Sequence, residues 1–396
     1  MPHVNRPRRV LGLILGIGLL AGTAACTSGA GGQAVTAPDA APVAAVTASP
    51  AFGTTTVTPT QPVSITVTHG RIDSLALTSP AGAQVKGTVS PDGTSWTVAE
   101  PLGYGKTYTV TGTATGTDGK SVSIDGSYTT VTPTDKLTSK ISPGDNAVVG
   151  VAAPVIVRFG SAPVDRALVE QHVSITTTPQ VEGAWAWITH DGDTWPSLDW
   201  RPKTYWPAGT TVHVSSDLYG LDLGGGQFGG DTVTSDFTIG RNQVVVADAN
   251  AHTMVVQRDG VTVATYDASY GSGDVIGDPN RVTRSGIHIV MDKKETTTMS
   301  NPAYGYTDVT EHWAVRISDN GEFIHQNQDT VAAQGVDNVS HGCINLSAQD
   351  AQAYFQTAIY GDPVEVTGTS VQLSPADGDI YDWAIPWSEW TTLAAN

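Results

Sequence analysis

Short runs in which apolar and polar residues alternate occupy most of the first 240 residues. Between residues 51 and 132 they include Val63–Val67, Tyr108–Val110 and Val122–Ile124, with turn residues between them at intervals of roughly ten. Residues 133–240 repeat this pattern. Alternation with a period of two, broken by turns at this spacing, is typical of antiparallel sandwiches. The chain therefore predicts two β-sandwich domains, and no pattern in either of them implies catalysis.

A third β-rich region begins near residue 242, with apolar runs such as Gln243–Ala247 and Gly286–Met291. One helix is expected at residues 348–360, where apolar residues follow helical spacing. Ser347 suits its N-cap, and Gly361 suits its end. Three tryptophans then gather within residues 382–390 of the C-terminal segment, which predicts packing against a domain surface.

The first 50 residues do not follow the sandwich pattern. Residues 1–9 carry three arginines and no acid, and residues 10–25 are apolar or small, which is typical of an export signal. The run ends in Thr23-Ala24-Ala25-Cys26 and resembles the bacterial lipobox, which implies that Cys26 becomes a lipidated N-terminus. Residues 26–50 contain few large apolar side chains and are expected to form a flexible tether. We therefore expect an extracytoplasmic protein that is anchored to the cell membrane by the lipid on Cys26.

Charge and cysteine content narrow the classes of function. The chain has 20 basic and 38 acidic residues, and its net charge of −18 becomes −21 when the signal and its three arginines are removed. An acidic surface repels phosphate backbones, so nucleic acid is not an expected partner. With only Cys26 and Cys343 present, neither a disulfide framework nor a Cys-based zinc site is expected.

Cys343 carries the candidate chemistry. It lies in the run Ser340-His341-Gly342-Cys343-Ile344-Asn345, and His325 lies 18 residues upstream. A thiolate nucleophile needs an imidazole that accepts its proton and later returns it. Gly342 would allow a tight turn that brings backbone N–H groups close to an oxyanion. On composition alone, a buried structural cysteine remains an equal alternative.

The same run, with a histidine 18 residues upstream, closely resembles the signature of the L,D-transpeptidase catalytic domain. Thr283-Arg284-Ser285-Gly286 is a partial match to a further motif of that family. The resemblance implies a mainly β fold with two immunoglobulin-like sandwich domains (51–132 and 133–240) and a β-rich catalytic domain with one main helix (241–368). A Trp-rich segment (369–396) would then pack on the catalytic domain.

The resemblance also implies a reaction. Cys343 would attack the third residue of a peptidoglycan stem peptide, release the terminal D-alanine and form a thioester. The side-chain amine of a diamino acid on a second stem would resolve the thioester into a 3→3 cross-link. The expected partners are therefore a tetrapeptide donor, an amine acceptor, carbapenem inhibitors and the membrane that holds the lipid. No cofactor and no metal is expected.

Each residue of the expected site takes its role from the resemblance. His325 would be the general base and acid, and the backbone carbonyl of Gln326 would orient its ring. His341 and Gly342 would shape the oxyanion site, Ser340 belongs to the same catalytic group, and Asn345 would support the turn. The substrate-binding residues would be Tyr306, Met291, Gln326 and Asn320, with residues 292–304 forming a lid over the site.

Other families of Cys–His enzymes need residues at positions where this sequence does not have them. A sortase needs an arginine after its cysteine, yet residues 317–396 contain no Lys or Arg. An NlpC-type peptidase places its histidine after its cysteine, and no histidine follows Cys343. An L,D-carboxypeptidase, in which water resolves the same thioester, remains an alternative. A cell-wall scaffold without catalysis is the non-enzymatic alternative.

Overall fold

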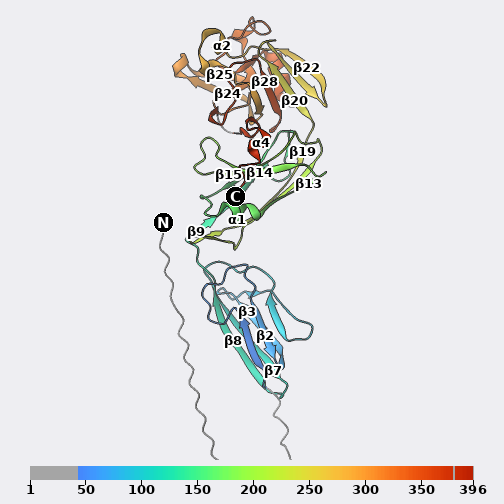
Figure 1. Cartoon of the computed structure of the whole chain (residues 1–396), viewed down its shortest axis with the longest axis vertical. Helices are drawn as coiled ribbons and strands as arrows, with labels where there is room; N and C mark the ends of the chain where they lie inside the picture. Colours follow the sequence, from blue (N-terminus) through green and yellow to red (C-terminus); the bar gives the residue numbers. More distant parts are fainter. Residues whose placement is uncertain (1–42, 378–379, 396) are drawn as a thin grey trace, which may run out of the picture.

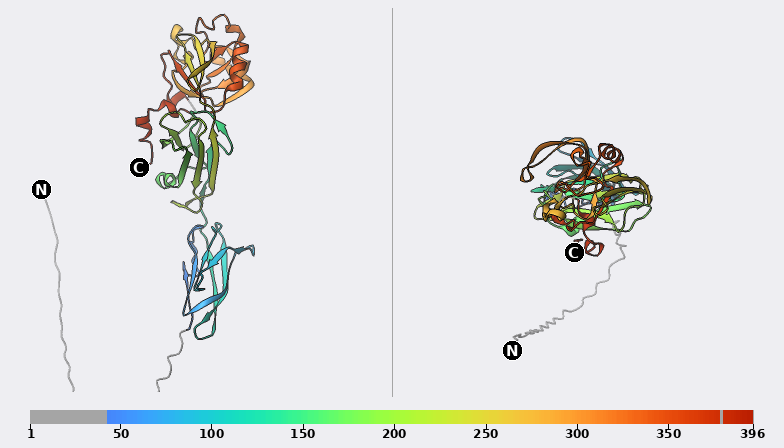
Figure 2. Two further views of the ribbon diagram at one scale, coloured as in Figure 1. Left: turned by 90° about the vertical axis from the view of Figure 1, so that its right-hand side faces the viewer. Right: turned by 90° about the horizontal axis from the view of Figure 1, so that it is seen from above.

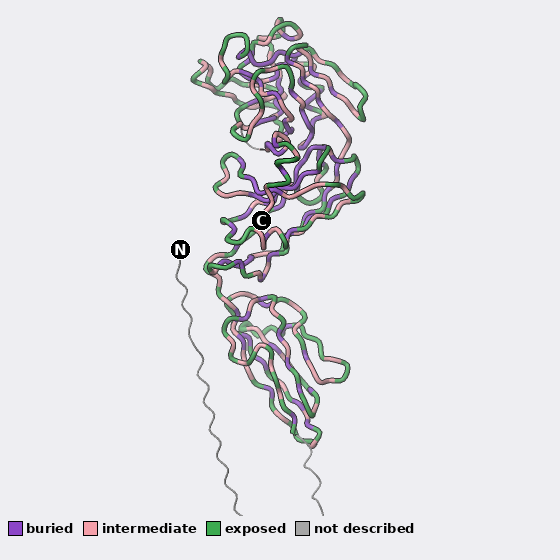
Figure 3. Tube along the Cα trace, in the orientation of Figure 1, coloured by how far each residue is buried: buried purple, intermediate pink, exposed green. Residues whose placement is uncertain are grey.

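Three bodies built of strands follow one another along the long axis of the molecule (Figures 1 and 2). The computed structural model describes residues 43–377 and 380–395. The fold is mainly β, as predicted, and buried segments gather inside each body while hairpin tips are exposed (Figure 3). No helix within the described ranges is long and apolar enough to cross a membrane. The predicted signal and Cys26 lie outside the described residues.

The first body is a sandwich of two four-stranded sheets. In β2 and β7 alternate side chains are buried, among them Ile65, Val67, Tyr108 and Val110, so the period-two pattern places one face of each strand in a shared core. The tether predicted for residues 26–50 is wrong at its end, because β1 pairs with β2 in the first sheet. The strands, in sheet order, are β1 (Ala45–Ser49), β2 (Ser64–Thr68), β6 (Ser95–Val98) and β5 (Gly87–Val89), then β4 (Gln84–Val85), β3 (Gly70–Thr78), β7 (Thr107–Gly116) and β8 (Ser121–Thr129).

The second body is a sandwich with a small third sheet at the end that faces the first body (Figure 1). Trp200 and Trp206 meet in its core with ring centroids 4.8 Å apart. The first sheet holds β10 (Ser139–Ser142), β12 (Val155–Phe159), β15 (Ser197–Pro202) and β14 (Gly183–Ile188). The second holds β11 (Val148–Val149), β19 (Thr232–Ile239), β16 (Thr211–Asp217) and β13 (Val173–Thr178), with helix α1 (Arg166–Gln171) leading into β13. The third holds β17 (Asp222–Gly224), β18 (Gln227–Gly229) and β9 (Asp135–Leu137).

The third body contains two sheets and the helix α3 (Ala348–Thr357). The side chain of Ser347 accepts a hydrogen bond from the Asp350 N–H and caps the helix, as expected. The helix ends before Gly361, earlier than predicted, because Ala358 already adopts an extended backbone. One sheet holds β22 (Val261–Asp267), β21 (Thr253–Arg258), β20 (Gln243–Asp248), β28 (Pro363–Thr367) and β23 (Gly286–Ile289). The other holds β24 (Asp292–Asn301), β25 (Tyr306–Arg316), β26 (Phe323–Gln326) and β27 (Ile344–Leu346). The short helices are α2 (Gly273–Ile276), η1 (Pro279–Arg281), η2 (Pro302–Tyr304), η3 (Gln328–Thr330), η4 (Pro375–Asp377), η5 (Asp382–Ala384) and α4 (Trp387–Trp390).

Hydrogen bonds join each body to the next. The Tyr104 hydroxyl of the first body donates to the Gly229 carbonyl of the second at 2.6 Å. At the other junction, the Gly150 N–H of the second body donates to the Tyr360 carbonyl at 2.7 Å, and the Tyr205 hydroxyl donates to Glu365 at 2.8 Å. The connections therefore involve fixed polar contacts as well as the chain itself.

The C-terminal segment packs on the third body and, with its tryptophans, on the second sandwich, so the prediction that it packs on the catalytic domain holds for only part of its length. Trp390 is fully buried, and its indole N–H donates to the Ala184 carbonyl of β14 at 2.9 Å. The Arg201 guanidinium of β15 lies 4.7 Å from the ring centroid of Trp390 and 4.7 Å from that of Trp383. Strand β14 has an apolar face that needs cover, and the tryptophans supply it. The start of the segment and η5 follow the prediction, since Asp377 pairs with Arg284 and η5 contacts β23.

Candidate active site

The pairing of two short strands brings His325 and Cys343 together. β26 and β27 run parallel, with His325 opposite Asn345, so Cys343 lies just before β27 at the same edge of the sheet. Neighbouring strands are about 5 Å apart, which suits a side-chain hydrogen bond between the two residues. As a whole residue His325 is 3% exposed, whereas Cys343 is partly exposed. A buried imidazole thus lies beside an accessible thiol.

The turn that carries the thiol is braced from two sides. Gly342 has a φ of +126°, a left-handed conformation that residues with a Cβ adopt only under strain. The Ser340 hydroxyl donates to the Cys343 carbonyl at 2.6 Å and accepts from the Gly342 N–H at 3.1 Å. The Thr283 hydroxyl donates to the Gly342 carbonyl at 2.8 Å and accepts from the Gly271 N–H at 2.9 Å. This bracing explains why threonine stands at position 283.

The Nδ1 atom of His325 has two acceptors. The Gln326 carbonyl lies 2.7 Å from Nδ1, which is the contact that the resemblance implied. The Glu311 carboxylate lies 3.1 Å from the same atom. Because Nδ1 is occupied in this way, the hydrogen bond between the ring and Cys343 falls to Nε2. His325 is therefore oriented on one side and faces the nucleophile with the other.

Electrostatics favour a protonated ring. Burial lowers the pKa of His325, but hydrogen bonds to Cys343 and Glu311 and the charges of both groups outweigh burial and raise the pKa to about 10. Burial, followed by the charges of Cys343 and Glu311, raises the pKa of the Tyr306 hydroxyl. Burial and the positive charge of Arg281 lower the pKa of His341. The site therefore keeps His341 neutral while it favours a cation on His325.

A cavity of about 270 Å³ lies over the thiol. The Cys343 Sγ atom also lies 3.5 Å from the Gly321 carbonyl oxygen. The cavity is lined by residues of the lid hairpin (β24, η2 and β25), of β26, of η3 with its N-cap, and of β27 with the turn before it. These residues are Met299, Tyr306, Val309, Glu311, His325, Asn327, Asp329, Thr330, Val339, Ser340, His341, Cys343 and Asn345.

Comparison with known proteins gives this arrangement a family. A model of the L,D-transpeptidase catalytic domain (YkuD) matches residues 242–366, and a model of a bacterial Ig domain matches residues 54–222. The chain is 45% identical to L,D-transpeptidase 5 of Mycobacterium tuberculosis over 390 residues, which cover 98% of this chain and 85% of that protein. The chain belongs to the L,D-transpeptidase family. It is also 37% identical to L,D-transpeptidase 2 of M. tuberculosis, over 87% of this chain and 83% of that one. A solved L,D-transpeptidase in complex with imipenem is 34% identical, with a TM-score of 0.49 over 59% of this chain and 100% of that one.

Most residues expected at the site of this L,D-transpeptidase do converge. Cys343, His325, Ser340, His341, Asn345 and Tyr306 all line the cavity. The Tyr306 and His341 rings lie 5.3 Å apart. Gly342 and Gln326 contact this group, since the Gly342 N–H donates to the Ser340 hydroxyl and the Gln326 carbonyl lies against Nδ1 of His325. The sequence motif therefore identified one compact site.

Two expected substrate-binding residues lie elsewhere, and Asn345 of the expected catalytic group has another role. Met291 precedes the base of the lid hairpin and lines a separate hollow beside Tyr381, so the methionine that reaches the cavity is Met299. The N–H of Asn320 donates to the Asp377 carbonyl, which ties its turn to the C-terminal segment. Asn345 binds Thr330 at 3.3 Å, while Ser340 and Thr283 support the turn in its place.

The residues predicted to form a lid, 292–304, form β24 and η2, and β24 pairs with β25 in a β-hairpin. Its second strand supplies Tyr306, Val309 and Glu311 to the cavity. The sequence analysis missed Glu311. The alternation of Val309 and Glu311 along one strand was the available signal, but only the folded structure shows that this face meets His325.

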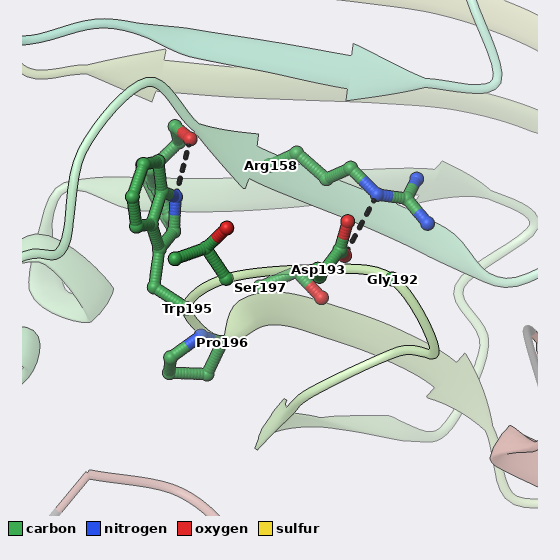
Figure 4. A pocket seen from close by; sticks show the side chains of 8 residues that line it. Arg158, Gly192, Asp193, Trp195, Pro196 and Ser197 are labelled. Atoms are coloured by element: carbon green, nitrogen blue, oxygen red, sulfur yellow. Dashed lines mark hydrogen bonds and ion pairs between the residues drawn. The ribbon is translucent and has the colours of Figure 1, made fainter.

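A second hollow, of about 180 Å³, lies on the second sandwich (Figure 4). Arg158 on its wall donates to Asp193 at 3.1 Å, and the Trp195 indole N–H donates to the Phe159 carbonyl at 2.7 Å. These polar groups are therefore directed at each other and at the backbone. The hollow brings together no nucleophile and base like the pair in the third body.

Proposed function

We propose that this L,D-transpeptidase forms 3→3 cross-links between peptidoglycan stem peptides through a thioester on Cys343. The observation that carries the proposal is the oriented His325 ring beside an accessible Cys343 at the floor of a cavity. Relatives named L,D-transpeptidases over almost the whole chain support the same reaction.

The acylation half of the reaction follows from the proton positions. The proton of Cys343 moves to Nε2 of His325, and the thiolate attacks the carbonyl carbon of the third stem residue. The carbonyl oxygen becomes an oxyanion, the C–N bond to the terminal D-alanine breaks, and His325 returns its proton to the leaving amine. The product is a thioester and free D-alanine.

The second half uses the same imidazole in reverse. An acceptor amine attacks the thioester, His325 removes a proton from that amine, and the new amide forms as Cys343 leaves. The contact of Nδ1 with the Gln326 carbonyl keeps the ring in one orientation through both halves. A single base therefore serves acylation and transfer.

The oxyanion needs donors that are not already committed. The Gly342 N–H is engaged with the Ser340 hydroxyl, so Gly342 contributes its turn geometry rather than a donor. The Tyr306 hydroxyl and the backbone N–H groups of His341 and Cys343 belong to residues that line the cavity, which makes them the candidate donors.

The decisive experiment is product analysis with purified tetrapeptide stems. We expect a cross-linked dimer and one D-alanine released for each link. Tripeptide without dimer would instead assign the L,D-carboxypeptidase reaction. Cys343→Ala should abolish turnover and also the covalent carbapenem adduct, detected as a mass increase of the intact protein. A wild-type protein that forms neither product nor adduct would favour a scaffold.

The proposal extends to location. A lipidated Cys26, followed by a tether and two sandwich bodies, would hold the catalytic body out from the membrane within the wall. The support is the lipobox-like run before Cys26 and the linear order of the bodies (Figure 1). Cys26→Ala should release the protein from the membrane fraction, and a variant that stays membrane-bound would contradict lipid anchoring.

A further inference from the structure

The lid hairpin brings a carboxylate into contact with the catalytic imidazole. Glu311 lies on β25, opposite Thr297 of β24, and its carboxylate oxygen is 3.1 Å from Nδ1 of His325. The Glu311 side chain is 17% exposed and that of His325 is 4% exposed, so water screens the contact only weakly. The contact therefore has the geometry and the burial of a strong, charge-assisted hydrogen bond.

The Gln326 carbonyl alone would suffice to orient the ring, because it is the nearer acceptor at 2.7 Å. What Glu311 adds is a negative charge. A carboxylate close to an imidazole stabilises its protonated form, and a protonated imidazole in turn stabilises a neighbouring thiolate. The carboxylate thus acts on Cys343 through the ring that separates them.

We propose that Glu311 is a positioning residue that holds Cys343 and His325 as a thiolate–imidazolium pair in the resting enzyme. One proton moves from Sγ of Cys343 to Nε2 of His325, while the Nδ1 proton stays shared between the Gln326 carbonyl and Glu311. The role builds on the proposed function, since it prepares the nucleophile of that reaction. Because Glu311 belongs to the lid hairpin, Cys343 is held as a thiolate only while this hairpin keeps Glu311 against His325.

Other ionisable groups lie around His325, and one outside the cavity provides a control. Cys343, Tyr306, His341 and Asp329 line the same cavity as His325 and Glu311. None of the hydrogen bonds and ion pairs found in the described chain joins Asp329 to the ring, although it carries the same charge as Glu311. Glu295 is exposed on β24 of the same hairpin. Glu295→Gln therefore removes one charge from the same hairpin without removing the contact.

The test measures the alkylation rate of Cys343 by iodoacetamide across pH 5–10 in the full chain. This reaction needs no stem peptide, so its outcome is independent of whether the enzyme transfers or hydrolyses. Wild type should already react as a thiolate near pH 6. Glu311→Gln should shift the rise in rate upward by about one pH unit or more, and should lose about tenfold in rate near pH 6 while it matches wild type near pH 10. The control variant Glu295→Gln should follow the wild-type profile.

A merely structural role makes a different prediction. It would lower the melting temperature of Glu311→Gln and leave the pH profile unchanged, and that result would overturn the proposal. An unchanged profile with a higher KM for the acceptor would instead assign Glu311 to amine binding, and would overturn it as well.

A second measurement does not depend on folding of the Glu311 variant. The thiolate absorbance of the wild type near 240 nm, referenced to Cys343→Ala, should already be present at pH 6. A thiolate that appears only around the ordinary thiol pKa of about 8.5 would show that no resting ion pair exists.

Discussion

In the part of the chain that the structure describes, two buried histidines form hydrogen bonds to carboxylates, and the two pairs have different roles. In the third body, His325 lies 3.1 Å from Glu311, and in the second sandwich His190 lies 2.8 Å from Asp199. Both pairs raise the pKa of the histidine, to about 10 at His325 and to about 9 at His190. Burial, short contacts and a raised pKa are therefore common to a catalytic site and to a structural one.

The difference lies in what each imidazole faces. His325 faces an accessible thiol at the floor of a cavity. His190 and Asp199 have fully buried side chains, and the Ser197 hydroxyl donates to Asp199 at 2.6 Å rather than to the imidazole. The serine, carboxylate and histidine are thus connected in the wrong order for a serine nucleophile, whose base must contact the hydroxyl.

The His190 cluster instead helps to hold the C-terminal segment. Asp382 of η5 lies close to both His190 and Asp199, and burial raises its pKa. The charges of His190 and Arg201 oppose that rise, so two cations offset two carboxylates. Such a balanced buried cluster tolerates the loss of a partner poorly, which predicts effects on stability rather than on catalysis.

The sharpest contrast should come from replacing each histidine in turn. His325→Gln removes the base and should lower the rate of carbapenem acylation by about 10²–10⁴-fold. His190→Gln should leave that rate within about twofold, because distant sites act independently. Single-turnover acylation followed by mass spectrometry measures both. An equal loss in the two variants would mean that the second sandwich controls the active site.

The next largest effect should be on stability. Trp390→Ala removes a fully buried indole, its hydrogen bond to Ala184 and its stacking on Arg201, and should cost about 3–5 kcal/mol in the free energy of unfolding. Trp387 also stacks on Arg201 but is only partly buried, so Trp387→Ala should cost less. Denaturant unfolding gives both values. Equal costs would indicate that burial of Trp390 does not determine how tightly the segment is held.

The pH dependence of stability should separate the two histidines further. The unfolded pKa of histidine is about 6.5, and that of folded His190 is raised to about 9. Protonated His190 therefore stabilises the folded state fully below pH 6.5, and this contribution, up to about 3 kcal/mol, is lost as pH rises through 9. The difference in unfolding free energy between wild type and His190→Asn should shrink between pH 6 and 10. The raised pKa of His325 changes the unfolding free energy in the same direction. Because His325 is present in both proteins, its contribution cancels in the difference. A constant difference would mean that His190 is not charged in the fold.

The sequence was enough to predict what depends on local periodicity and on one motif. Alternating runs identified the strands of the sandwiches, Ser347 identified the start of α3, and the run that ends in Asn345 located the nucleophile beside its base. These features depend on near neighbours in the chain or on a single strand pairing, so a linear pattern contains them.

What the sequence could not predict depends on surfaces that meet only in the folded chain. The C-terminal tryptophans cover β14, which lies about 200 residues earlier and gives no sign in its own sequence of what covers it. Met299 reaches the cavity in place of Met291 because the lid is a long hairpin whose tip and base lie far apart. Glu311 meets His325 by the same hairpin geometry.

The smallest expected effect should come from Thr283, whose hydroxyl braces the turn that carries Cys343. Thr283→Val keeps the shape of the side chain but leaves the Gly342 carbonyl and the Gly271 N–H without the hydroxyl that binds both. We expect carbapenem acylation to slow by about tenfold, because a displacement of the thiol of about 1 Å weakens attack. Thr283→Ser retains the hydroxyl and should stay close to wild type. Should both variants acylate at the wild-type rate, Ser340 alone would be sufficient to hold Cys343 against His325.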